Sequence, residues 1–141
     1  MKQLVLAAIL AVTAACARST AAGDDSAAGP PLGSVGDTAA RQSDWSAIEK
    51  LEAQAKAIAK VNGCSSASEC RAAPVGSRAC GGPRYYIPYC AKTTDSAALY
   101  SKLAEVAKAE QAYNKKYQIM STCEYRMPPV PSLSGGACKG Q

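Results

Sequence analysis

Residues 75–89 have the sequence Val75-Gly76-Ser77-Arg78-Ala79-Cys80-Gly81-Gly82-Pro83-Arg84-Tyr85-Tyr86-Ile87-Pro88-Tyr89. Its central segment, residues 80–83, has the strongest turn chemistry in the chain, because glycine accepts left-handed backbone and proline cannot continue a helix. We therefore predict short strands on both sides of this turn, over residues 71–75 and 85–89, and a third strand over residues 124–127.

An amphipathic helix is predicted on each side of this region, over about residues 44–61 and 95–117. In both segments apolar side chains recur every three or four residues, which places them on one face of a helix. Asn62-Gly63 is suited to end the first helix, and Thr94 or Asp95 to cap the second. The two apolar stripes contain Trp45, Ile48, Leu51, Ala55, Ile58 and Val61 in the first helix and Leu99, Leu103, Val106, Ala109 or Glu110, Tyr113 and Tyr117 in the second.

The apolar content of residues 44–141 is too small to hold a fold without help. Ile, Leu and Val supply only 12 of these 98 residues, and the chain contains no Phe. Such poverty in large aliphatic residues is otherwise typical of disordered chains, and small exported domains compensate for it with disulfides. We predict a small disulfide-stapled α+β domain, in which two helices pack on a short irregular antiparallel sheet.

Six of the seven cysteines are predicted to form three disulfides once Cys16 is assigned to the export signal. An even number of cysteines in an exported domain favours bridges over metal binding. Six cysteines allow 15 connectivities, so the pairing is a hypothesis: a local Cys123–Cys138 bridge, with the other four cysteines paired among themselves. The six are Cys64, Cys70, Cys80, Cys90, Cys123 and Cys138.

The N-terminus has the pattern of an export signal, with Lys2 followed by an apolar run that is too short to span a bilayer. Thr13-Ala14-Ala15-Cys16 resembles a bacterial lipobox, although its first position is usually leucine. We predict a signal peptide over residues 1–15 and a lipid anchor on Cys16. The resemblance to bacterial lipoproteins implies that Ala17, which follows the lipidated cysteine, directs the protein to the outer membrane if the organism has one. The alternative is ordinary cleavage after residues 15–17, which would release a secreted protein.

Residues 16–43 are predicted to be a disordered tether, because they consist mainly of Ala, Ser, Thr, Gly, Pro and Asp. The tether joins the anchor to the folded domain, which is predicted over residues 44–141. The chain carries 16 basic and 11 acidic residues, a net charge of +5. This charge favours contact with anionic lipid headgroups or cell-wall polymers. Nucleic acid is not an expected partner, because the only clustered cations are Lys115-Lys116.

Three segments of the chain carry a resemblance to a known family. They are residues 75–89, residues 113–123, which end in Ser121-Thr122-Cys123, and Pro128-Pro129. The chain resembles small signal-bearing bacterial envelope proteins with a G-x-x-x-C-G-G-P-x-x-Y-I core and a late S-x-C. Tyr86 and Ile87 match the Y-I pair. The resemblance covers about residues 62–138. It implies export and a shared fold, but no reaction, because the family has no established activity.

The composition excludes several catalytic chemistries. With no histidine, the chain has no His-based triad, no His-ligated zinc and no imidazole acid–base catalyst. The spacing of Glu69, Asp95 and Glu124 does not favour a pair of glycosidase carboxylates. There is also no Cys-x-x-Cys redox pair. We predict a protein that is not an enzyme and that holds no cofactor and no metal.

Arg84, Tyr85, Tyr86 and Tyr89 form the candidate binding patch, because tyrosine combines apolar area with a hydrogen-bonding tip. The alternative is that some of these tyrosines pack in the core, as alternation along a strand requires. Two other segments have open interpretations. Residues 80–83 form either an anion-binding nest or a tight turn, and residues 127–131 are either a ligand-like loop or a rigid connector.

Three functions are consistent with this pattern. The predicted one is a non-catalytic binding module on a lipid tether, which docks another envelope or extracellular component, such as a protein partner. The second is a protease inhibitor that presents a disulfide-braced loop around Arg84. The third is a structural spacer with no specific partner.

Overall fold

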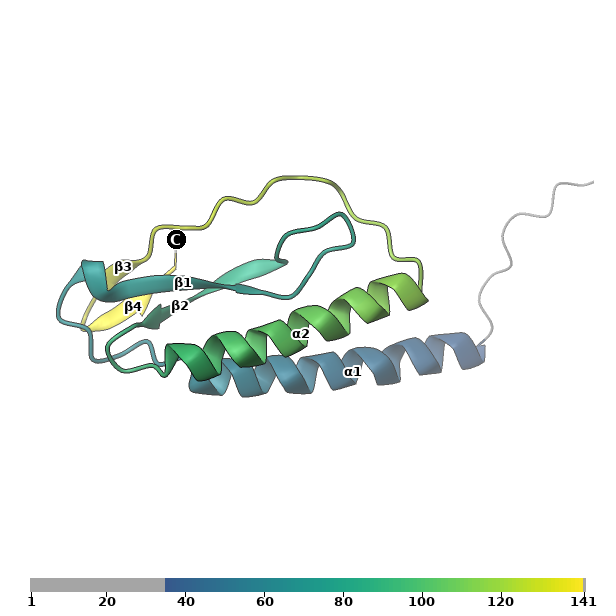
Figure 1. The fold of residues 1–141 in the computed structure, drawn as a ribbon, viewed down its shortest axis with the longest axis horizontal. Coiled ribbons are helices and arrows are strands. Elements are labelled where there is room, and N and C mark those ends of the chain that lie inside the picture. Colours follow the sequence, from purple (N-terminus) through teal and green to yellow (C-terminus); the bar gives the residue numbers. More distant parts are fainter. Residues whose placement is uncertain (1–34, 141) are drawn as a thin grey trace, which may run out of the picture. The chain divides into compact units, whose positions relative to one another are not determined.

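Two helices form one layer and two small β-hairpins form the other in the computed structural model, which describes residues 35–140 (Figure 1). The helices are α1 (Val35–Ile58) and α2 (Ser96–Lys116), with a 3₁₀ turn at Ala67–Glu69 between them. The strands are β1 (Cys70–Val75), β2 (Tyr85–Cys90), β3 (Ser132–Ser134) and β4 (Ala137–Lys139). The predicted α+β class is confirmed, although the strands form two separate two-stranded sheets.

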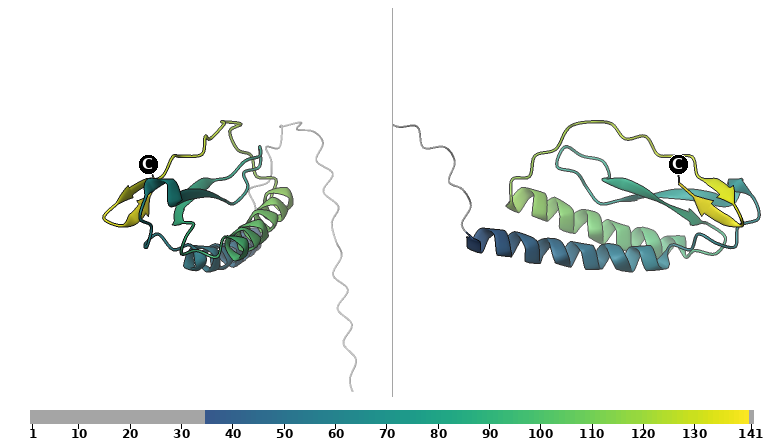
Figure 2. Two further views of the ribbon diagram at one scale, coloured as in Figure 1. Left: turned by 60° about the vertical axis from the view of Figure 1, so that its left-hand side comes forward. Right: turned by 180° about the vertical axis from the view of Figure 1, so that it is seen from behind.

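The β1–β2 hairpin packs its inner face on the helix pair (Figures 1 and 2). Alternate residues of a strand point to the same face, so the inner and outer residues of this hairpin are distinct sets. Ala73 lies opposite Ile87 and Val75 opposite Tyr85 in the antiparallel register. These inner residues join the core of the domain, whose buried members are Ile48, Ala55, Ala73, Val75, Tyr89, Leu99, Leu103 and Val106.

Both strands of this hairpin contain a proline where the ladder requires no amide donor. Pro74 lies opposite Tyr86, and Pro88 opposite Ala72. The amide of Cys90, two positions from Pro88, donates to the carbonyl of Lys60 outside the ladder. Amides at alternate positions therefore point away from the partner strand, and the two prolines remove donors only from the outer edges. Missing donors discourage further strands from pairing with these edges.

Helix α1 begins at Val35, nine residues before its predicted start, so the tether prediction is wrong for residues 35–43. Alanine and other helix-compatible residues continue the helix toward the N-terminus, and Arg41 lies over the ring of Tyr117 at 5.3 Å. The contact joins α1 to the end of α2, far away in the sequence, so the composition of residues 16–43 could not predict it. The signal peptide, Cys16 and tether residues 16–34 lie outside the described residues.

Helix α1 ends at Ile58, three residues before its predicted end. The amide of Lys60 donates to Thr94 Oγ1 at 2.9 Å, and the Lys60 carbonyl accepts from Cys90. The carbonyl of Val61 accepts from the amide of Cys138. The helix stops here because the next backbone groups pair with the sheet layer instead. Helix α2 keeps its predicted span to within one residue at each end, and Asp95 is its cap, accepting from the amide of Ala98.

The predicted strand over residues 124–127 is wrong. Residues 119–131, here called the strap, are extended but have no strand partner, and Pro128, Pro129 and Pro131 offer no amide for a ladder. The β3–β4 hairpin was not predicted. Its turn, Gly135-Gly136, has positive φ at both residues, as a two-residue hairpin turn requires.

Three disulfides are present, Cys64–Cys90, Cys70–Cys138 and Cys80–Cys123, which confirms their number. The hypothesised Cys123–Cys138 bridge is wrong. The extended strap carries the chain from the β1–β2 turn, where Cys123 lies, back to the opposite end of that hairpin, where β4 holds Cys138 (Figures 1 and 2). Each of the two cysteines therefore meets a partner that is distant in sequence.

Candidate functional site

The four residues of the predicted binding patch do not share one surface. Tyr89 is only 4% exposed and belongs to the core, whereas Tyr85 lies at the edge of the core. Arg84 is half-buried beside it. Tyr86 alone is on the outer face, since it is in register with Pro74 rather than with a core residue. Alternation along β2 turns Tyr85 and Tyr89 toward the core and Tyr86 outward, whereas Arg84 lies just before the strand.

Arg84 is the centre of a charged network that joins β2 to both helices. Its guanidinium pairs with Glu52 on α1 and with Glu110 on α2. Glu52 also accepts from the hydroxyl of Tyr85, and the Arg84 guanidinium lies 5.2 Å from the ring centre of Trp45. Because both carboxylates hold it in place, Arg84 is not presented to a protease. The geometry gives no support to the inhibitor hypothesis.

Glu110 is the most buried charge of this network, with 2% of its side chain exposed. Its carboxylate accepts from the amide of Ser77, at the start of the β1–β2 turn. Burial raises the pKa of Glu110, while this amide and Arg84 act in the opposite direction. Gly76 makes this approach possible: its φ is +76°, and a Cβ there would lie 2.0 Å from Glu110 Oε2. The glycine of the G-x-x-x-C-G-G-P pattern thus leaves room for a buried carboxylate.

Glu52 is held in its ionised form. Burial acts to raise its pKa, but hydrogen bonds from Lys56, Tyr85 and Arg84 outweigh burial and lower the pKa to about 2. A lowered pKa in the folded state stabilises the fold above the ordinary value of 4.5, and this contribution is lost as the pH falls toward 2. Both carboxylates are thus occupied by internal partners, and we assign the network a stabilising role.

Residues 80–83 form a tight turn, as the simpler of the two interpretations proposes. The amide of Gly81 donates to the carbonyl of Arg78, and the amide of Arg78 donates to the carbonyl of Gly82, both at 2.9 Å. The Gly81 amide is therefore not available to an anion. The turn is joined to the strap by the Cys80–Cys123 disulfide and by the Cys80 amide, which donates to Ser121 Oγ at 3.0 Å.

An open groove of about 300 Å³ lies between this turn and the strap. Tyr86, Tyr125, Arg78 and Arg126 line it, with the Cys80–Cys123 disulfide. Arg78 donates to the carbonyl of Glu124, Arg126 to that of Arg84 at 3.2 Å, and the Tyr86 hydroxyl to that of Arg126 at 3.4 Å. Side chains from the hairpin thereby fix the backbone of the strap over residues 121–126.

The strap carries most of the exposed large apolar side chains in the described residues. Met120 is 93% exposed, Tyr125 83%, Met127 76% and Val130 78%. The fifth such residue, Tyr100 on α2, is only 44% exposed. We call Met120, Tyr125, Met127 and Val130 the strap surface. In Figures 1 and 2 the strap arches over the hairpin, on the side away from the helices.

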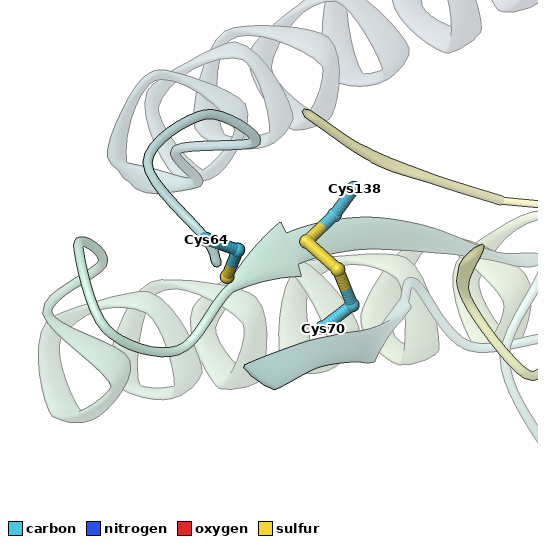
Figure 3. A group of neighbouring side chains, drawn as sticks. All are labelled: Cys64, Cys70 and Cys138. Carbon is cyan, nitrogen blue, oxygen red and sulfur yellow. A yellow bond between two sulfur atoms is a disulfide. The ribbon is translucent and has the colours of Figure 1, made fainter. Parts of the chain in front are cut away.

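Three cysteine sulfurs have the spacing of a metal site. The Sγ atoms of Cys64, Cys70 and Cys138 all lie within 4.8 Å of one another (Figure 3). All three are in disulfides: Cys64 is bonded to Cys90, and Cys70 is bonded to Cys138. An oxidised sulfur is not a thiolate ligand. The four cysteines form a second small core, against which Leu133 packs.

The sequence prediction missed Arg78, Arg126, Tyr125 and Met120 as surface residues of interest. The sequence contains one signal for this surface: the stiff segment 127–131, which can form a ligand-like loop, is the second half of the strap. The Cys80–Cys123 bridge and the contacts between the hairpin and the strap backbone determine which strap side chains remain exposed. These contacts join residues that are far apart in the sequence, so local patterns did not reveal them.

Comparisons with protein-family models, curated proteins and solved structures found no match to this chain. Within residues 35–140, neither helix has the length and apolar character needed to cross a bilayer.

Proposed function

We propose that this protein is an exported, lipid-anchored protein of the bacterial cell envelope, whose disulfide-braced domain is a non-catalytic binding module. One observation carries the binding role: four large apolar side chains, each at least 76% exposed, lie on a single extended segment. Apolar side chains that gather on one surface segment are typical of an interaction site. The domain has few large aliphatic residues, yet these four large apolar side chains remain exposed to water. Their exposure favours a role in binding.

The fixed backbone of the strap favours binding over a simple spacer. The Cys80–Cys123 disulfide and the contacts of Arg78, Tyr86 and Arg126 hold residues 121–126 of the strap against the hairpin. Such pre-organisation lowers the entropy that a binding surface loses when it meets its partner. A spacer would need neither the pinned strap nor its exposed apolar side chains.

Export is supported by independent features. The three disulfides fit an oxidising compartment outside the cytosol. The signal pattern of residues 1–15, the lipobox-like sequence ending at Cys16 and the resemblance to envelope proteins support a lipid anchor. An outer-membrane location, in an organism that has one, follows from Ala17.

We expect the mature protein to begin at an acylated Cys16. Mass spectrometry of the N-terminal peptide should find Cys16 with added diacylglycerol, and Cys16→Ser should accumulate as the uncleaved precursor. Thr13→Leu is the control, because it restores the usual first residue of a lipobox and should be processed at least as well. A mature chain that begins after residue 15, 16 or 17 with no acyl mass would contradict the anchor.

Peroxide oxidation tests the binding role without any substitution, because Met120 and Met127 are the only methionines after the signal peptide. Both are exposed, so in the purified chain they should form sulfoxides rapidly. In the intact envelope we expect oxidation of both to be slowed at least several-fold, because a bound partner covers the strap. Equal rates in the two samples would show that nothing covers the strap and would reject the binding role.

A further inference from the structure

We propose that the strap surface rests on the membrane that holds the Cys16 anchor, with its apolar side chains in the headgroup region of an anionic bilayer. The inference rests on the lipid anchor and binding role proposed above and names their partner. It is carried by four features of the described residues: the exposure of the strap side chains, their rigid presentation, their shape as a ridge and the surrounding positive charge.

Residues 121–126 of the strap are held against the hairpin, so Tyr125 cannot withdraw into the domain. Cys123 is bonded to Cys80, and the carbonyls of Glu124 and Arg126 accept from Arg78 and Tyr86. Met120 and Met127 lie just outside this fixed segment and Tyr125 lies within it. The transfer of apolar surface from water into the acyl boundary is favourable in proportion to its area. Tyrosine adds a hydroxyl that suits the polar side of the interface.

The strap is a ridge rather than a concave pocket. In Figures 1 and 2 it bows outward over the β1–β2 hairpin and forms the outermost segment on that side of the domain. A lipid surface can accommodate a segment that bows outward, whereas a protein partner would have to supply a matching furrow. Tyr86 lines the groove beside the strap together with Tyr125.

Cations flank the ridge. Arg126 is a residue of the strap, and Arg78 donates to the strap backbone at Glu124. Lys115 and Lys116 are in the last turn of α2, just before the strap begins. Glu124 is the one acidic residue of the strap, and Lys116 is paired with Asp44 at 2.6 Å. Residues 35–140 carry 14 Lys and Arg against nine Asp and Glu. The domain as a whole therefore has an excess of positive charge, which favours contact with an anionic leaflet.

The first described residue of the chain and the start of the strap lie at the same end of the helix pair. The first residue of α1, Val35, and the last residue of α2, Lys116, lie at one end of the helix pair, and the strap leaves α2 there (Figure 1). Eighteen residues, 17–34, join α1 to Cys16. A lipid on Cys16 keeps the domain at a high local concentration near the bilayer, so even a weak contact of the strap is populated.

Vesicle binding by the unlipidated chain separates strap docking from the anchor. The oxidised chain from Ala17 to Gln141 contains every described element and is mixed with vesicles of phosphatidylethanolamine and phosphatidylglycerol, or of phosphatidylcholine alone. We expect partitioning onto the anionic vesicles, weakened by NaCl and much lower on phosphatidylcholine. Met120→Ser/Met127→Ser should lower the partition coefficient about tenfold. Tyr100→Ser is the control, because Tyr100 is an exposed aromatic residue of α2 rather than of the strap, and it should change partitioning less than about twofold.

Each outcome decides between the proposals. An absence of binding to anionic vesicles, or equal binding by the strap variant and the wild type, overturns membrane docking. If the methionines are then still protected from peroxide in the envelope, a protein or a second copy of this chain covers the strap, and the binding role stands. If they are unprotected, the proposed function fails as well. Circular dichroism of the strap variant checks that its fold is intact.

Discussion

Reduction of the three disulfides is expected to unfold residues 35–140 completely at neutral pH and ambient temperature. The main core has eight buried residues, of which two are alanines, and the second core is made of cysteines. The bridges close loops with sequence separations of 26, 43 and 68 residues. Each closure of this size contributes about 3–4.5 kcal/mol in the chain-entropy model. Their sum matches the total stability of about 5–15 kcal/mol that is usual for a domain.

Urea unfolding followed by far-UV circular dichroism, with and without a dithiol reductant, measures this effect. Two paired variants make the test sharper. Cys70→Ala/Cys138→Ala removes a buried bridge, 4% and 2% exposed, and should cost at least about 4 kcal/mol. Cys80→Ala/Cys123→Ala removes the exposed bridge of the strap and should cost less, because no buried cysteine contact is lost. A reduced chain that still unfolds cooperatively at an unchanged urea concentration would contradict the stapled-core interpretation.

Arg84→Ala is expected to lower the free energy of unfolding by about 3–5 kcal/mol, because it leaves the buried carboxylate of Glu110 without its countercharge. Only 2% of the Glu110 side chain is exposed, so the carboxylate depends on Arg84 for its countercharge. The control is Lys102→Ala, which breaks the exposed Lys102–Glu105 pair and should cost less than about 1 kcal/mol. Adding Glu110→Gln to Arg84→Ala should recover part of the loss, since the unpaired charge is then gone.

Urea midpoints measured against pH report the same network. The pKa of Glu52, about 2 in the folded chain, predicts a loss of stability as the pH falls from about 4.5 toward 2. Arg84 is one of the three groups that lower this pKa, so the loss should be smaller in Arg84→Ala. Wild-type stability in Arg84→Ala would show that Arg84 is not held in the interior. It would reopen the inhibitor hypothesis, which a trypsin-like protease panel would then test.

Local signals predicted helix α2 and the main hairpin well. Apolar periodicity placed α2 within a residue at each end, and Asp95 caps it as expected. The turn chemistry of residues 80–83 placed β1 and β2 correctly, because glycine and proline act on the backbone where they stand. These features depend on residues that are close together in the sequence, so they can be predicted from the sequence alone.

Features that depend on distant contacts were not predictable in the same way. The early start of α1 accompanies the contact of Arg41 with Tyr117. The disulfide pairing follows from the path of the strap, which no local pattern encodes. Arg84 and Tyr85 were grouped with Tyr86 as one surface because their buried partners, Glu52 and Glu110, come from two separate helices.

The most direct test of membrane docking is photo-cross-linking from position 127 in the lipidated protein in its own envelope. A photoreactive phenylalanine analogue replaces Met127 on the strap, and a second variant carries it in place of Lys108, an exposed residue of α2. We expect adducts with phospholipid from position 127 and few or none from position 108. A discrete cross-link from position 127 to one protein, without lipid adducts, would contradict it.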